Sequence, residues 1–283
     1  MTTQHERILV TGAGGLVGSG IRPYLAEQFA EVVLLDRTAP TAVARNERIV
    51  VGELSDRALL AEAMVGVTGV VHLACVHGFT INFEDTIDSN YRGLVRLLEA
   101  FVAAGGSHFV YASSHHGWGY YPRDELVRES DPPRPDSWYA VSKIFGEAAV
   151  AHLADANGFS ALSLRIGNCS PAVTDERCTH MWTSFRDVAD LAARGLQRPA
   201  LGHRAVFATA DCTDPFFDNS GLADLGFATQ DRPEDNLALP SIATEPKADG
   251  LFGLSVGGNY ATSNLKTDIA TWQRINQTAR GGP

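Results

Sequence analysis

The chain has 283 residues, 45% of them hydrophobic, which is enough to bury a sizeable core in one large domain. A formal net charge of -10 argues against a nucleic-acid surface, and four scattered cysteines without a CxxC pair argue against a disulfide framework or a cysteine-based zinc site. The N-terminal sequence has no signal-peptide pattern and no apolar run could span a bilayer, so we expect a cytoplasmic protein.

Short β-rich runs alternate with helical patterns in chain order. Strands are predicted at 7–12, 31–36, 48–54, 67–75, 108–114 and 159–166. Helices are predicted at 16–29, 56–64, 84–104 and 137–157. Apolar strands separated by helices indicate a parallel sheet covered on both faces, which is a doubly wound α/β fold.

The pattern loosens after residue 168. A helix is predicted at 184–196 and a short strand at 205–210, and the rest is mixed. We expect residues 1–170 to form the main domain and residues 171–283 a small, interleaved C-terminal lobe, so that the two regions are effectively one domain.

A glycine-rich turn follows the first predicted strand. The sequence TGAGGLVG places Gly12, Gly15 and Gly18 in G-x-x-G-x-x-G spacing. Glycine allows a sharp turn and a close approach to a pyrophosphate, while the following helix offers free N–H groups to the phosphates. An ordinary glycine-rich turn is the alternative. The flanking strand and helix, with Asp36 at the end of the second strand, favour a Rossmann-type dinucleotide site.

Asp36 bears on the choice of cofactor. A carboxylate at this place accepts hydrogen bonds from the adenosine ribose and repels a 2′-phosphate, which favours NAD over NADP. Arg37 could pair with that phosphate, and a solvated surface charge is the alternative for this residue. The other predicted cofactor contacts are Leu16, Val17, Glu53, Leu54, Leu73, Ala74 and Ile166.

A second motif, SWYAVSK, places Tyr139 and Lys143 four residues apart on one face of a predicted helix. An ammonium near a phenol lowers the tyrosine pKa and would make a general base that works near neutral pH. A surface contact between ring and lysine stem is the alternative for an isolated pair. With the dinucleotide loop and a serine that ends the fifth strand, the pair indicates a catalytic site.

TGxxGxxG, the strand-end serine and YxxxK resemble the extended short-chain dehydrogenase/reductase superfamily over residues 7–171. In that family the serine lies five residues before a turn glycine, which is Gly119 here, so Ser114 rather than Ser113 matches. The resemblance implies that Ser114 hydrogen-bonds the reacting oxygen, that Tyr139 transfers the proton, and that Lys143 lowers the tyrosine pKa and holds the nicotinamide ribose.

Further site residues follow from the same resemblance. Asn90, in DSNYRGL, matches the asparagine that fixes a proton-relay water, and a helix-interior polar residue satisfied by water is its alternative. His115 and His116 come directly after Ser114, and we expect their side chains to face the substrate at the carboxyl end of the sheet.

A closer resemblance concerns the substrate. The segments SSHHGWGYYP, RPDSWYAVSKIFGE, RIGNCSP, TDPFFDNS and GGNYATSN look like uronate dehydrogenases, which oxidise the C1 hydroxyl of cyclic glucuronate or galacturonate with NAD to an aldarolactone. The resemblance implies that Arg177 binds the C6 carboxylate, and a surface salt bridge with Asp175 or Glu176 is the alternative. The short C-terminal lobe also suits a small free sugar better than a sugar nucleotide.

Three positions depart from that family's pattern in the expected substrate pocket. His77 and Asn168 stand where serines are usual, and His115 stands where an asparagine is usual. These changes leave open another aldose, a sugar phosphate or a differently charged sugar acid. His77, His115, His116 and His180 match no metal motif, so we predict no metal site.

Three functions therefore compete. The first is an NAD-dependent C1 dehydrogenase of a sugar acid, and the second is a sugar epimerase or dehydratase that recycles bound NAD, which Asn168 favours. The third is a cofactor-binding regulator without activity, which the intact catalytic set argues against. Family resemblance also implies a homo-oligomer paired through the helices that carry Asn90 and Tyr139. From the charge and the absence of a long apolar run, we expect no nucleic-acid or membrane partner.

Overall fold

A seven-stranded parallel sheet forms the centre of the computed structural model, which describes residues 6–41, 44–198 and 202–279. The strand order is β3-β2-β1-β4-β5-β6-β9, and each neighbouring pair is parallel. Its strands are β1 (Arg7–Thr11), β2 (Glu31–Asp36), β3 (Glu47–Val51), β4 (Val67–His72), β5 (His108–Ser114), β6 (Ser160–Ile166) and β9 (His203–Ala208). The predicted doubly wound α/β fold is confirmed.

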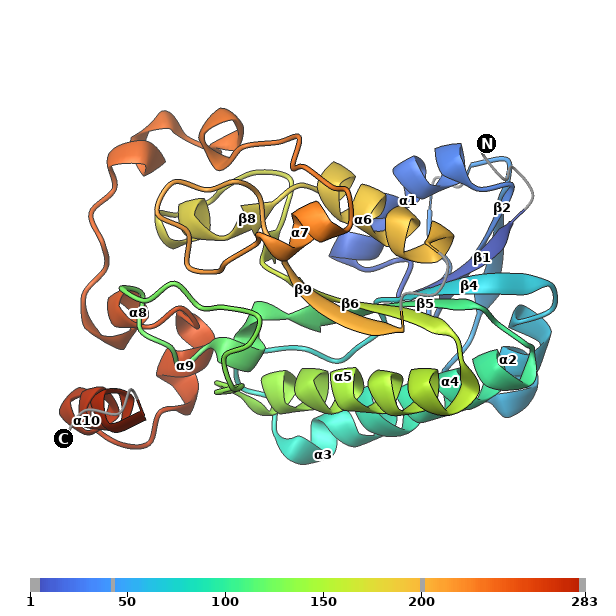
Figure 1. Ribbon diagram of the computed structural model, residues 1–283, viewed down its shortest axis with the longest axis horizontal. Helices are drawn as coiled ribbons and strands as arrows, with labels where there is room; N and C mark the ends of the chain where they lie inside the picture. The colour runs from blue at the N-terminus through green and yellow to red at the C-terminus, as the bar shows by residue number, and fades with distance from the viewer. Residues whose placement is uncertain (1–5, 42–43, 199–201, 280–283) are drawn as a thin grey trace.

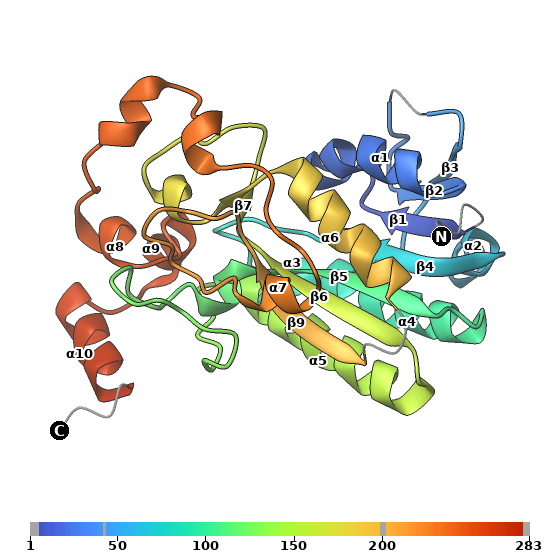
Figure 2. The ribbon, with the colours of Figure 1, turned by 45° about the horizontal axis from the view of Figure 1, so that its top comes forward.

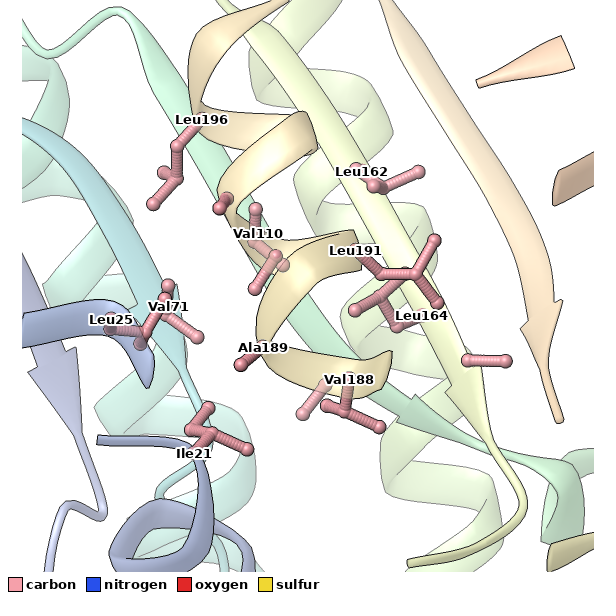
Figure 3. Close-up of a cluster of buried hydrophobic side chains, with 14 of the residues drawn as sticks. Ile21, Leu25, Val71, Val110, Leu162, Leu164, Val188, Ala189, Leu191 and Leu196 are labelled. Atoms are coloured by element: carbon pink, nitrogen blue, oxygen red, sulfur yellow. The ribbon is translucent and has the colours of Figure 1, made fainter. Parts of the chain in front are cut away.

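Helices cover both faces of this sheet (Figure 1). One face carries α1 (Leu16–Gln28) and α6 (Phe185–Gln197), and the other carries α2 (Arg57–Ala63), α4 (Leu94–Ala103) and α5 (Trp138–Asn157). Figure 3 shows Val188 and Leu191 of α6 with Leu162 and Leu164 of β6 in one buried cluster. Full burial of each such side chain contributes about 1.5–3 kcal/mol, so packing fixes α6 on the sheet.

The helix predicted at 84–104 contains a segment of a different kind. It starts as α3 (Phe83–Thr86), continues as the π-helical η1 (Ile87–Gly93) and ends as α4. The apolar periodicity located the helix, but it carried no sign of the wider turn. Asn90 lies within this π-helical segment.

Two predicted strands are shorter than expected. The strand predicted at 48–54 ends at Val51, and the strand predicted at 67–75 ends at His72. The residues that follow leave the sheet and line a cavity at its carboxyl edge. Several of them are apolar, and this apolar character made the predicted strands too long.

The chain after β6 builds a small region at the carboxyl edge of the sheet (Figures 1 and 2). Its elements are β7 (Asn168–Cys169), η3 (Arg177–His180), β8 (Trp182–Thr183), α7 (Gly221–Asp224), η4 (Pro233–Asn236), η5 (Pro240–Thr244), α8 (Gly250–Leu254), α9 (Asn259–Asn264) and α10 (Ile269–Ala279). Strand β9 pairs with β6 in the main sheet, and helix α6 packs on that sheet. The division at residue 170 stays a prediction, and parts of both regions lie outside the described residues.

No helix in the described part of the chain is both long and apolar enough to cross a membrane.

Candidate active site

A cavity of about 830 Å³ opens where β1, β4, β5 and β6 end. Its volume lies in the range of small-molecule and cofactor sites, and its position is where doubly wound sheets bind ligands. The cavity lining brings together every predicted cofactor and substrate residue: Gly12, Gly15, Leu16, Val17, Gly18, Asp36, Arg37, Glu53, Leu54, Leu73, Ala74, His77, Ser114, His115, His116, Tyr139, Lys143, Ile166, Asn168 and Arg177. Asn90 lies behind this wall.

The glycine-rich turn has the geometry that a dinucleotide requires. Gly12 has φ +70°, and a Cβ atom there would lie 2.6 Å from the backbone nitrogen of Ala74, so only glycine fits. Helix α1 begins after Gly15 without a side-chain cap and without an acidic residue in its first turn. Its N–H groups and positive dipole end are therefore available to a pyrophosphate, and this part of the cavity fits NAD.

Asp36 holds the glycine-rich turn and also lines the cavity. Its Oδ2 accepts a hydrogen bond of 2.9 Å from the backbone N–H of Gly14, and its Oδ1 accepts one of 3.3 Å from that of Thr38. No sequence pattern predicted these two hydrogen bonds. Arg37 is exposed beside it, which agrees with the interpretation as a solvated surface charge.

Helix α5 brings the two members of the YxxxK motif to the cavity. Ser137 caps the helix by accepting a hydrogen bond of 3.1 Å from the N–H of Ala140. The buried Nζ of Lys143 donates to the carbonyl of Ala112 at 2.7 Å and lies 5.6 Å from the ring centroid of Tyr139. An ammonium has three donors, so two more are available to a cofactor ribose.

The pKa of Tyr139 differs in direction from the sequence-based expectation. Burial raises this pKa well above the ordinary value, and the nearby Cys75 raises it further, whereas a hydrogen bond with Ser114 lowers it. The predicted lowering by Lys143 does not govern the phenol, because desolvation of the tyrosinate outweighs it in this fold.

Asn90 is engaged by the protein. Its Oδ1 accepts from the N–H of Val76 at 2.7 Å, and its Nδ2 donates to the carbonyl of Val76 at 2.8 Å and to Oγ of Ser142 at 2.9 Å. The side chain thus ties the loop after β4 to η1 and α5. Both amide hydrogens are used, and the predicted water-relay role stays a prediction.

His116 belongs to a group that the sequence did not reveal. Its Nδ1 lies 2.7 Å from Oδ2 of the buried Asp136, and its ring packs against that of Tyr260 at an interplanar angle of 36°, with centroids 3.9 Å apart. Burial lowers the pKa of His116 well below its usual range and raises that of Asp136 to about 7. Asp136 and Tyr260 fall in segments that resemble the family, but no spacing marked them individually.

His115 lies beneath His116, with ring centroids 4.0 Å apart. Its Nδ1 is 3.0 Å from the carbonyl oxygen of Ile166, and its Nε2 is 3.3 Å from Nη2 of Arg177. Burial lowers the pKa of His115 well below its usual value, so the ring is neutral. Both ring nitrogens are occupied by protein partners. The ring lines the cavity, and the expected position facing the substrate stays a prediction.

Arg177 is a buried cation, 9% exposed, at the wall of the cavity. Its Nε donates to the carbonyl of Val256 at 2.9 Å, and its Nη2 also donates there. The alternative salt bridge is wrong among the described residues, since Asp175 caps the N–H of Cys178 and Glu176 pairs with Arg123. Arg177 therefore makes no salt bridge in the described part of the chain, and the charges of Asp175 and Asp136 act on it from a greater distance.

The remaining predicted positions are more loosely placed. His77 is exposed, with its ring centroid 6.1 Å from that of Tyr139, and Asn168 accepts a hydrogen bond from Ser170 at 2.7 Å. His180 pairs with Glu176 outside the cavity. Among the residues that the structure describes, no group of three or more His, Cys, Asp or Glu side chains could hold a metal ion.

Comparison with known proteins agrees with this arrangement. Residues 8–202 match the NAD dependent epimerase/dehydratase family. Uronate dehydrogenase of Pseudomonas putida is 32% identical over 264 residues, covering 93% of this chain and 98% of that protein. A mutant uronate dehydrogenase of Agrobacterium tumefaciens in complex with NAD has a TM-score of 0.85 and 31% identity, covering 93% of this chain and 99% of that one.

An NAD-dependent glucose-6-phosphate dehydrogenase of Haloferax volcanii is also similar, at 29% identity over 85% of this chain and 98% of that protein. The family match covers more than half of the chain and includes the glycine turn, Ser114, Tyr139 and Lys143. This chain therefore belongs to the NAD dependent epimerase/dehydratase family, as an NAD-dependent oxidoreductase similar to the uronate dehydrogenases.

Proposed function

We propose that the protein oxidises the C1 hydroxyl of a cyclic hexuronate, such as glucuronate or galacturonate, to an aldarolactone. The observation that carries this proposal is Arg177, a buried guanidinium without a salt bridge among the described residues, in the cavity that also holds Tyr139 and Ser114. A buried charge without a directly paired counter-ion is costly, and a substrate carboxylate would supply that direct pairing with charge-assisted hydrogen bonds.

The proposed chemistry removes two hydrogens from C1 and its hydroxyl. Ser114 holds the hydroxyl oxygen, and Tyr139 takes the hydroxyl proton while the C1 hydrogen leaves as hydride and the C1=O bond of the lactone forms. When bound, NAD supplies the hydride acceptor and a positive charge on its nicotinamide ring. No leaving group departs from the sugar, so the site needs no further acid.

Tyr139 needs help to accept a proton, because burial holds its own proton in place. The Lys143 ammonium, 5.6 Å from the Tyr139 ring centroid, favours the tyrosinate. We propose that Lys143 also holds the nicotinamide ribose through its remaining donors, and that Asp36 holds the adenosine ribose. Asn90 would keep the Val76 loop at the cavity wall.

The test is the absorbance of reduced nicotinamide in purified protein with NAD and one sugar at a time. Glucuronate and galacturonate should give stoichiometric reduction, and glucose, galactose and their 6-phosphates should give much less. Reduction with the neutral or phosphorylated sugars alone would overturn the substrate and keep the redox chemistry. If none of the sugars caused net reduction, an epimerase or dehydratase that recycles NAD would replace the proposal.

Arg177→Ala separates the role of the guanidinium from general damage. Its KM for glucuronate should rise at least tenfold, while its KM for the uncharged glucuronamide should change little, because only the charge-assisted bonds are lost. Equal effects on both compounds would remove Arg177 from the carboxylate role.

We also propose a homodimer through the face that carries α3 and α5. Phe83 and Trp138 are 41% and 45% exposed there, with ring centroids 5.3 Å apart. Such exposed aromatic pairs are typical of protein interfaces. Sedimentation should show a dimer that Phe83→Glu dissociates, and a monomeric wild type would contradict this assembly.

A further inference from the structure

The guanidinium of Arg177 is held on one side only. Nε and Nη2 both donate to the carbonyl of Val256, a residue 79 positions further along the chain. Nη2 also lies 3.3 Å from Nε2 of His115. Among the described residues Nη1 has no hydrogen-bond partner, and Arg177 lines the cavity. Nε and Nη2 are thus held by the protein, and Nη1 is available to bind an anion.

The partners of His115 determine which of its nitrogens carries the hydrogen. The carbonyl of Ile166 can only accept, so Nδ1 at 3.0 Å must donate to it. The guanidinium of Arg177 can only donate, so Nε2 must present its lone pair. Both contacts are satisfied together only by the neutral Nδ1–H tautomer.

The His115 ring has little freedom to turn. The ring packs against that of His116 at an interplanar angle of 37°, with centroids 4.0 Å apart, and it meets Phe217 edge-on at 5.7 Å. His116 is in turn held by Asp136 at 2.7 Å. The imidazole therefore acts as a rigid acceptor between the end of β6 and η3.

We propose that His115 is a positioning residue, whose imidazole directs the guanidinium of Arg177 toward the sugar carboxylate and so sets the preference for acidic over uncharged sugars. This inference rests on the proposed function. It differs from a direct substrate contact, because both ring nitrogens of His115 are already used by Ile166 and Arg177. Without the Nε2 acceptor of His115, Nη2 of Arg177 would be hydrogen-bonded to Val256 alone. The guanidinium could then rotate away from the sugar carboxylate.

Three substitutions at one position isolate the Nε2 acceptor. Asparagine places its amide near the Nδ1 position and can reach only Ile166, whereas glutamine is one methylene longer and places an amide oxygen near the Nε2 position, within reach of Arg177. Phenylalanine keeps the ring shape and has neither group. His115→Gln is therefore the rescue variant, and thermal melting shows which variants fold.

The first measurement is KM and kcat with glucuronate and glucuronamide, together with calorimetric binding of glucuronate to the NADH complex. His115→Asn and His115→Phe should raise both KM and Kd for glucuronate about tenfold, the size expected for one misaligned charge-assisted bond. The kcat, the NAD affinity and the KM for glucuronamide should stay within about twofold, and His115→Gln should keep most of the acid affinity.

The second measurement combines His115→Phe with Arg177→Ala. If His115 acts through Arg177, the double variant should bind glucuronate no more weakly than Arg177→Ala alone. Effects that simply add would overturn the proposal, as would wild-type acid affinity in a folded His115→Asn protein.

A third measurement needs no sugar and separates this inference from the proposed function. Nitrogen NMR of the histidine rings, assigned with His115→Asn, should show the Nδ1–H tautomer for His115 and a shift of its Nε2 signal in Arg177→Ala. An Nε2–H tautomer would overturn the positioning role even if uronates are oxidised. If the wild type shows no preference for uronates, the proposed function fails and the NMR result alone decides whether His115 directs Arg177.

Discussion

Gly258 offers a sharp test of how the carboxylate end of the site is built. The residue has φ +56° and ψ -126°, a backbone conformation that residues other than glycine rarely adopt. A Cβ atom at Gly258 would lie 2.7 Å from Nε of Arg177. Gly258→Ala should therefore strain the backbone and push the guanidinium away from Val256 and the cavity.

Both effects have a magnitude. The strain costs about 1–3 kcal/mol, and the reduced freedom of the unfolded chain offsets about 0.4–1 kcal/mol, so the free energy of unfolding should fall by up to about 2.6 kcal/mol. To restore an ordinary contact of 3.4 Å, the guanidinium must move by about 0.7 Å. A misaligned charge-assisted bond loses about 1.5–3 kcal/mol, which corresponds to a KM for glucuronate about 10- to 100-fold higher.

Steady-state kinetics with glucuronate and glucuronamide, with thermal melting, measures both effects. Gly158→Ala is the matched control, because Gly158 also has a positive φ of +74° but a Cβ atom there would meet no atom within 4 Å. The control should lose stability and keep the wild-type KM. Our account of Arg177 is refuted if Gly258→Ala is destabilised yet keeps its KM for glucuronate.

Three further predictions concern the cofactor half and the buried acid. Tyr139→Phe should lower turnover by about 10²- to 10⁴-fold and leave NAD affinity, measured by fluorescence titration, nearly unchanged. Asp36→Ala should raise the NADP-to-NAD ratio of kcat/KM at least tenfold, and should lower the melting temperature because the Gly14 N–H loses its acceptor. Burial holds the pKa of Asp136 at about 7 in the folded protein, above about 3.9 when unfolded, so wild-type stability should fall as pH rises between these values. The melting temperature of Asp136→Asn minus that of the wild type should therefore increase from pH 5 to pH 8. A difference that does not change with pH would contradict this assignment.

Local patterns were sufficient for the sheet and the cofactor half. Strand apolarity, the glycine spacing and the Tyr139–Lys143 pair each lie within a few residues, and the parallel fold brings strand ends to one edge. The ends of β3 and β4 were predicted too late, because cavity-lining residues such as Leu73 are as apolar as strand residues.

Contacts between distant residues were beyond such patterns. Nothing in the sequence links Arg177 to Val256, or His116 to Asp136, because only the folded chain brings these groups together. The direction of the Tyr139 pKa was predicted wrongly for the same reason, since the motif revealed the lysine but not the burial. Roles that depend on residues close in the sequence could be predicted. Properties that depend on burial and on contacts between distant residues could not.

The π-helical segment Ile87–Gly93 makes the length of this helix as important as its composition. An α-helix turns by about 100° per residue, and a wider turn absorbs an extra residue without breaking the rod. Deleting one residue between positions 87 and 93 would let the helix close regularly but rotate Asn90 out of phase with the buried face of α4. The helix should therefore accept substitutions at its exposed positions and reject any change in length, so that the Val76 loop depends on a residue count as well as on the Asn90 side chain.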